Sequence, residues 1–150
     1  MPCTSIPARK LILPPNSAAM AAFAQSVRVP LSTGEEQYTR WEFRELLEQN
    51  AVGIIQPDIC HAGGMSELQK IAAMAETYYV TVAPHNSNGP ISTVASLHLD
   101  MAVNNCHMQE LFLNSLDLYQ EVLTNPLNSG NAAIAAEPIM QNTAVIGMLL

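Results

Sequence analysis

The chain has 150 residues, of which 49% are hydrophobic and only 13% are charged, and its formal net charge is −7. This length is typical of a single domain, and the charged fraction lies well below the value of about a quarter that is usual in soluble proteins. The six Lys and Arg residues are scattered, so we expect no nucleic-acid partner, because binding a phosphate backbone requires clustered cations.

The cysteines and the chain ends indicate a cellular compartment. Cys3, Cys60 and Cys106 lie far apart and form no Cys-x-x-Cys pair, which argues against a thiolate zinc site and for reduced thiols in a cytoplasmic protein. Residues 1–10 lack the apolar segment of a secretory signal. The apolar run 144–150 is too short to cross a bilayer, so we expect no membrane partner.

Apolar patterns with helical and strand-like periods alternate along the chain. In chain order they predict a helix over 16–27, a strand over 28–33, a helix over 39–50, a strand over 52–57, a helix over 64–78, a strand over 79–84, a helix over 89–103 and a short strand over 106–111. Such alternation is typical of an α/β protein, in which helices cover a parallel sheet.

The predicted helices have recognisable apolar faces. In the helix over 39–50 we expect Trp41, Leu46 and Leu47 on the buried side. In the helix over 64–78 the expected apolar stripe is formed by Leu68, Ile71, Ala72 and Ala75.

Four polar residues follow the predicted strands, namely Glu35, Asp58, His85 and Glu110, at intervals of 23, 27 and 25 residues. A (β/α)8 barrel uses about 31 residues per unit and places its active site at the carboxyl ends of the strands. A doubly wound sheet would gather its ligands at one switch point instead. Four successive strand ends with polar groups therefore favour part of a barrel.

Asp58 and His85 lie on neighbouring predicted strands and form a candidate carboxylate–imidazole dyad for proton transfer. The alternative for Asp58 is a helix cap or a hydrogen bond to local backbone amides. Glu35 is a candidate ligand for Mg²⁺, which prefers oxygen donors, and its alternative is a surface acid beside Glu36. Glu110 could hydrogen-bond a developing enolate or pair with another buried group. His61, in the loop after its strand, is a weaker candidate for ligand contact.

Four motifs in this order, "TGE", "QPDICHAGG", "APHNSNGP" and "MQE", resemble the enolase superfamily, in particular its mandelate racemase/muconate lactonizing enzyme-like acid-sugar dehydratases, which include galactonate dehydratases. The resemblance covers about residues 13–126. It implies the second half of a TIM-like (β/α)7β barrel, in which parallel strands alternate with helices, and a Mg²⁺-dependent conversion of a sugar acid into a 2-keto-3-deoxy sugar acid.

The resemblance also implies a role for each candidate residue. Glu35 matches the third metal ligand, and His85 matches the acid/base histidine that protonates the leaving hydroxyl. Asp58 matches the dyad partner of His85, and Glu110 matches the carboxyl that stabilises the enolate oxygen. Racemases and cycloisomerases of the same superfamily remain alternatives, because they share the barrel face.

The chain also departs from the family pattern. Arg9-Lys10-Leu11 stand where the family has "EEP", and Glu36 stands where it usually has Arg. We therefore expect a non-family leader over 1–12, the barrel half over 13–126 and a divergent tail over 127–150. We expect the isolated chain to be an inactive fragment, since two metal ligands and the opposing base are missing, or a non-catalytic remnant that docks on a partner. Open barrel edges would allow self-association.

Overall fold

The structure is a computed structural model that describes residues 9–10, 16–111, 118–119, 121, 123, 129–130 and 133–134. The main sheet contains four parallel strands in the order β1-β2-β3-β4. The strands are β1 (Arg9–Lys10), β2 (Leu31–Thr33), β3 (Ile54–Ile55) and β4 (Thr81–Val82). The helices are α1 (Ser17–Ser26), α2 (Thr39–Glu48), α3 (Met65–Thr77) and α4 (Pro90–Ala102). A separate antiparallel pair consists of β5 (Ser129–Gly130) and β6 (Ala133–Ile134).

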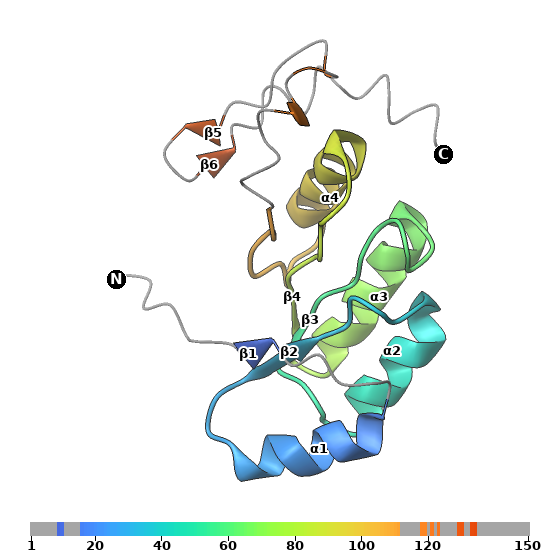
Figure 1. Ribbon diagram of the computed structural model, residues 1–150. Coiled ribbons are helices and arrows are strands. Elements are labelled where there is room, and N and C mark those ends of the chain that lie inside the picture. The colour runs from blue at the N-terminus through green and yellow to red at the C-terminus, as the bar shows by residue number, and fades with distance from the viewer. Residues whose placement is uncertain are drawn as a thin grey trace.

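The predicted α/β alternation is confirmed. Strands β2, β3 and β4 lie inside the three predicted strand segments, and each is followed by a helix. Successive strands are nearest neighbours in the sheet, as in a barrel. Figure 1 shows α2 and α3 side by side along one side of the sheet, with α1 beyond one end of this pair and α4 beyond the other.

The core lies between the sheet and these helices. The predicted stripe of α3 is confirmed, because all four of its residues are buried in the main hydrophobic cluster. Ile55 and Val82 are partners in the β3–β4 register and join the same cluster. Side chains alternate between the two faces of a strand, so Ser32, Ile54 and Thr81, which are also aligned in register, form a row on the opposite face.

The prediction for the buried face of α2 was wrong at one position. Leu46 and Leu47 are buried, but Trp41 is 63% exposed, and Phe43 occupies the core instead. Phe43, Leu46 and Leu47 follow the i, i+3, i+4 spacing of one helix face, whereas Trp41 is offset from it. The guanidinium groups of Arg40 and Arg44 lie over the exposed indole, at 5.4 and 6.0 Å from its ring centroid.

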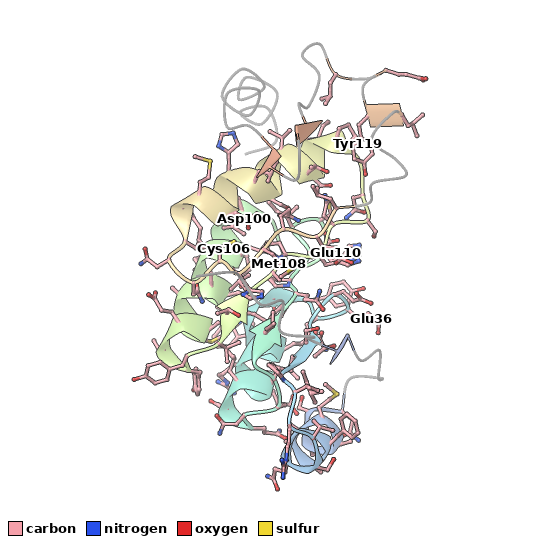
Figure 2. All side chains as sticks on the ribbon, turned by 90° about the vertical axis from the view of Figure 1, so that its left-hand side faces the viewer. Glu36, Asp100, Cys106, Met108, Glu110 and Tyr119 are labelled. Atoms are coloured by element: carbon pink, nitrogen blue, oxygen red, sulfur yellow. The ribbon has the colours of Figure 1, made fainter. Side chains whose placement is uncertain are left out.

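The ends of the sheet also differ from expectation. The strand predicted over 106–111 is reduced to one bridge, which joins Cys106 to Val82. The chain then continues past Met108 and Glu110 without regular strand pairing (Figure 2). The sequence pattern also missed β1, because Arg9 and Lys10 have neither the apolar nor the β-branched character of a typical strand. Within the part of the chain that the structure describes, no helix is both long and apolar enough to cross a membrane.

Candidate active site

Asp58 and His85 meet because the register of β3 and β4 continues past the strands. Ile55 pairs with Val82, and three residues later Asp58 forms a parallel bridge with His85. Residues aligned in this way in adjacent parallel strands place their side chains on the same face of the sheet. The Asp58 Oδ2 atom lies 2.7 Å from His85 Nδ1, so the predicted pair is in direct hydrogen-bond contact.

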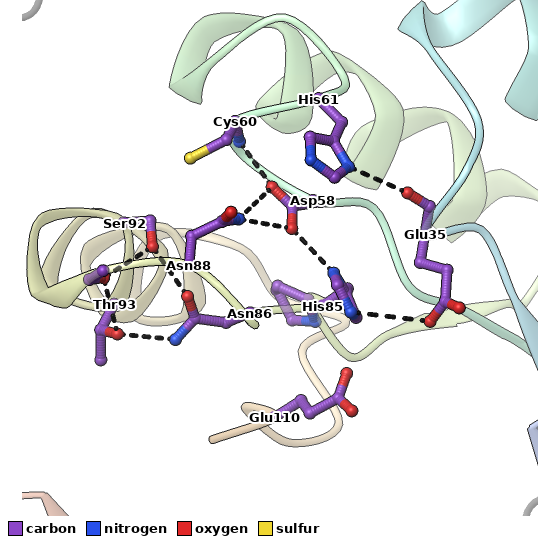
Figure 3. A network of polar contacts seen from close by, with 12 residues as sticks. Glu35, Asp58, Cys60, His61, His85, Asn86, Asn88, Ser92, Thr93 and Glu110 are labelled. Carbon is purple, nitrogen blue, oxygen red and sulfur yellow. Dashed lines mark hydrogen bonds and ion pairs between the residues drawn. The ribbon is translucent and has the colours of Figure 1, made fainter. Parts of the chain in front are cut away.

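The contacts of Asp58 define the hydrogen-bonding state of His85. Asp58 is fully buried, and its Oδ1 atom accepts a hydrogen bond from the Cys60 backbone N–H at 2.7 Å. The Asn88 side-chain amide donates to Oδ1 at 3.1 Å and to Oδ2 at 2.8 Å. An ionised carboxylate only accepts hydrogen bonds, so His85 donates through Nδ1–H, and its Nε2 atom is left to face the site (Figure 3).

Glu35 approaches His85 from the end of β2. Its Oε2 atom lies 3.7 Å from His85 Nε2. The turn that directs Glu35 depends on Gly34, whose φ of +135° is rarely adopted by residues with a side chain. A Cβ atom at Gly34 would lie 2.9 Å from the Gln56 backbone nitrogen, so the close approach of β2 to the segment after β3 also requires glycine.

A cavity of about 450 Å³ opens beside these groups, and Glu35, Glu36, Tyr38, His61 and His85 line it. The His61 Nδ1 atom lies 3.3 Å from the backbone carbonyl oxygen of Glu35, and because a carbonyl only accepts, this nitrogen is the donor. The His61 ring lies between the rings of Tyr38 and His85, with centroid distances of 6.4 and 6.5 Å. The weak sequence candidate His61 therefore borders the same cavity as His85.

Glu110 lies near the other candidates without lining that cavity. It is half-buried, and its backbone N–H donates to the Pro84 carbonyl oxygen at 3.3 Å. This bond holds Glu110 beside the strand end that leads to His85. The structure therefore gathers Glu35, Asp58 and His85 tightly, and it places Glu110 next to them in the following segment.

The loop after His85 contains polar residues that the sequence interpretation did not single out. Asn86 is buried, donates to Thr93 Oγ1 at 2.7 Å and accepts from Ser92 Oγ at 2.8 Å. Asn88 contacts Asp58 through its side chain and accepts a hydrogen bond from the Tyr119 hydroxyl at its backbone oxygen. The only sequence signal was the polar run "HNSN" between a strand and a helix.

Cys60 adjoins Asp58 but is not activated as a nucleophile. Burial, and secondarily the negative charge of Asp58, raise the pKa of the Cys60 thiol. A thiol with a raised pKa is less often in the nucleophilic thiolate form at neutral pH. The chemistry of the site therefore rests on the carboxylates and imidazoles.

Comparison with known proteins gives consistent matches. Residues 12–138 match the family described as "Enolase C-terminal domain-like". The chain is 47% identical over 87 residues to the D-galactonate dehydratase of Variovorax paradoxus (strain S110), a match that covers 58% of this chain. A member of the enolase superfamily from Salmonella Typhimurium has 43% identity and a TM-score of 0.68 over 70% of this chain. A mandelate racemase/muconate lactonizing enzyme-like protein from Roseovarius sp. TM1035 has 36% identity and a TM-score of 0.70 over 75% of it.

These relatives are much longer than the matched region. The match covers 23% of the Variovorax protein, and 27% and 29% of the Salmonella and Roseovarius chains. The chain therefore spans about a quarter of the length of these relatives.

The enolase superfamily implies a divalent metal, and the described residues do not by themselves fit one. Within the ranges given above, no group of three or more His, Cys, Asp or Glu side chains is arranged to hold a metal ion. Glu35 and Glu36 are the carboxylate residues that line the cavity, whereas Mg²⁺ requires near-octahedral oxygen coordination.

Proposed function

Because the chain belongs to the enolase C-terminal domain-like family, we propose that its site contains the acid/base half of an acid-sugar dehydratase. The observation that supports this best is the fully buried Asp58 carboxylate at 2.7 Å from His85 Nδ1, with His85 Nε2 facing a cavity. The 47% identity to a D-galactonate dehydratase makes a sugar acid the proposed substrate class.

His85 would act on the hydroxyl that leaves the sugar acid. Asp58 holds the imidazole with Nδ1–H inward, so a second proton on Nε2 would point into the cavity, and the carboxylate would stabilise the resulting cation. This proton passes to the departing hydroxyl as the carbon–oxygen bond breaks. Before this step, a base outside the described residues would have to remove the α-proton, and the electron pair of the broken carbon–hydrogen bond gives the enolate. As water leaves, the electron pair of the enolate forms the new carbon–carbon double bond of an enol. Transfer of the enol proton to carbon then gives a 2-keto-3-deoxy acid.

Two further carboxyl groups complete the proposal. We propose Glu35 as one ligand of a divalent cation, Mg²⁺ by resemblance, because it reaches the cavity from the end of β2 beside His85. In its protonated form Glu110 would donate a hydrogen bond to the enolate oxygen from the following segment, where its backbone N–H bonds to the Pro84 carbonyl oxygen.

We propose that the isolated chain lacks dehydratase activity, because its described donors are too few for Mg²⁺. Calorimetry at neutral pH with Mg²⁺, in the presence and absence of D-galactonate, tests this together with an assay for 2-keto-3-deoxy acid. No Mg²⁺ binding and no product are expected. Tight binding strengthened by galactonate, with product formation, would contradict this part of the proposal.

A chimera tests the role of the site itself. Residues of this chain would replace the matching segment of the Variovorax D-galactonate dehydratase, of which the match covers 23%. We expect the chimera to dehydrate galactonate, His85→Asn to reduce turnover at least about 100-fold, and His107→Asn, at an exposed histidine, to leave it unchanged. A chimera that exchanges the substrate α-proton with solvent without dehydration would point to a racemase instead.

A further inference from the structure

We propose that Asn88 is a positioning residue, which fixes the rotation of the Asp58 carboxylate and thereby holds the His85 ring in its Nδ1–H form. The importance of this role for catalysis rests on the proposed function. The geometric role does not, because it concerns only groups within this chain.

The first observation is the way in which Asn88 contacts the carboxylate. Its side-chain nitrogen lies within hydrogen-bond distance of both oxygens, at 3.1 Å from Oδ1 and 2.8 Å from Oδ2. Because Asp58 is fully buried, no solvent competes for these contacts. A donor that contacts both oxygens restrains the rotation of the carboxylate plane as well as the position of the group.

The second observation is that each of the other two donors contacts only one oxygen of the carboxylate. Cys60 N–H donates to Oδ1 alone, and His85 donates to Oδ2 alone. The terminal torsion of an aspartate is broad and roughly two-fold, so a rotation of the carboxylate would weaken the 2.7 Å bond to His85. Asn88 is the contact that opposes this rotation from both oxygens.

The third observation is that Asn88 is itself held in place at its backbone. Its carbonyl oxygen accepts from the hydroxyl of Tyr119, which is 5% exposed. On the other side, Asn86 ties the loop to α4 through Thr93 and Ser92 (Figure 3). The amide thus approaches Asp58 from a backbone fixed at two points, as expected for a group that orients another.

Nuclear magnetic resonance of the ¹⁵N-histidine-labelled full chain tests the proposal, with the His85 signals assigned by their loss in His85→Asn. In the wild type we expect one tautomer, with the proton on Nδ1. In Asn88→Ala we expect a mixture of tautomers and exchange of the Nδ1 proton with solvent at least about tenfold faster, the factor for losing one charge-assisted hydrogen bond.

Two further variants separate positioning from simple support of the loop. Asn88→Asp keeps the shape of the side chain but replaces the donor amide with a carboxyl group that faces Asp58, so the tautomer shift should be at least as large. Ser87→Ala, at the exposed neighbouring position, should leave the His85 signals unchanged.

An unaltered His85 tautomer and exchange rate in both Asn88 variants would overturn the proposal. Unfolding of Asn88→Ala, judged by circular dichroism, would overturn it as well, because it would assign Asn88 to holding the loop. These spectra are recorded on the full chain and do not depend on catalysis. If the spectra change as expected but the chimera has no dehydratase activity, the proposed function is wrong and the positioning role of Asn88 stands.

Discussion

At the scale of single residues, the site is organised around a buried charge that is surrounded by donors. Asp58 receives hydrogen bonds from the Cys60 backbone, the Asn88 amide and the His85 imidazole. A buried carboxylate with this set of partners is satisfied, whereas any replacement that brings its own donor is not.

Asp58→Asn is expected to lower the free energy of unfolding by about 2–3 kcal/mol. The variant offers one amide oxygen to three donors, so at least one N–H group would face another in a buried place. Urea denaturation measures the change. Glu76→Gln, which removes one charge at an exposed position on α3, should stay within about 0.5 kcal/mol of the wild type, and an equally small effect for Asp58→Asn would contradict the prediction.

A half-buried acid, Asp100 on α4, lies outside the site and faces Cys106 (Figure 2). Burial raises the pKa of Asp100 from 3.8 to about 6, against a smaller lowering by the Cys106 thiol. Burial and the charge of Asp100 raise the pKa of Cys106 to about 12. Between pH 3.8 and about 6 the folded protein therefore binds more protons at Asp100 than the unfolded chain does.

It follows that the contribution of Asp100 to stability is present below pH 3.8 and is lost as the pH rises to about 6. The Asn side chain of Asp100→Asn resembles the protonated acid. The free energy of unfolding of the variant, relative to that of the wild type, should therefore be about 1 kcal/mol higher at pH 7 than at pH 4. This value is discounted for the partial exposure of Asp100. Urea denaturation at both pH values checks this. The same difference between wild type and variant at both values would show that Asp100 does not titrate in this window.

At the scale of elements, the junction after each strand decides where the functional side chains lie. β3 and β4 continue in register as far as Asp58 and His85, whereas β2 ends in a bend at Gly34 that directs Glu35. The same loop positions that lack regular structure therefore determine the geometry of the site, as is common in barrels.

Gly34→Ala is expected to destabilise the protein by about 3 kcal/mol. The added Cβ would lie 2.8 Å from the Phe43 ring and 2.9 Å from the Gln56 backbone, at a φ of +135°. Thermal or urea unfolding measures the loss. Gly89→Ala is the matched control, because its φ is −83° and no atom lies within 4 Å of the added Cβ, so a comparable loss there would show that the effect is not local to Gly34.

At the scale of the whole molecule, the described sheet is open rather than closed. It ends at β1 on one side and at the single Cys106 bridge on the other. Strand edges with unpaired backbone groups favour pairing with another chain, and Met108, near the Cys106 edge, is 56% exposed. We therefore propose that the chain self-associates through its sheet edges.

Sedimentation velocity at increasing protein concentration is expected to show association, and Met108→Lys should weaken it at least about tenfold, because a lysine beside a sheet edge opposes pairing. Met101→Lys is the control, since Met101 is 65% exposed but lies on α4 and not in the edge segment itself. Equal weakening by both variants would point to general charge repulsion, and a monomer at all concentrations would contradict self-association.

The alternation of strands and helices, the buried stripe of α3 and the pairing of Asp58 with His85 could be predicted from the order of the amino acids. These features follow from local periods and from the near-constant distance between neighbouring parallel strands. Three features became apparent only in the folded protein: Phe43 rather than Trp41 enters the core, the last predicted strand is reduced to one bridge, and Asn88 contacts the Asp58 carboxylate. These outcomes depend on loop paths and on contacts between residues distant in sequence, which no local pattern encodes.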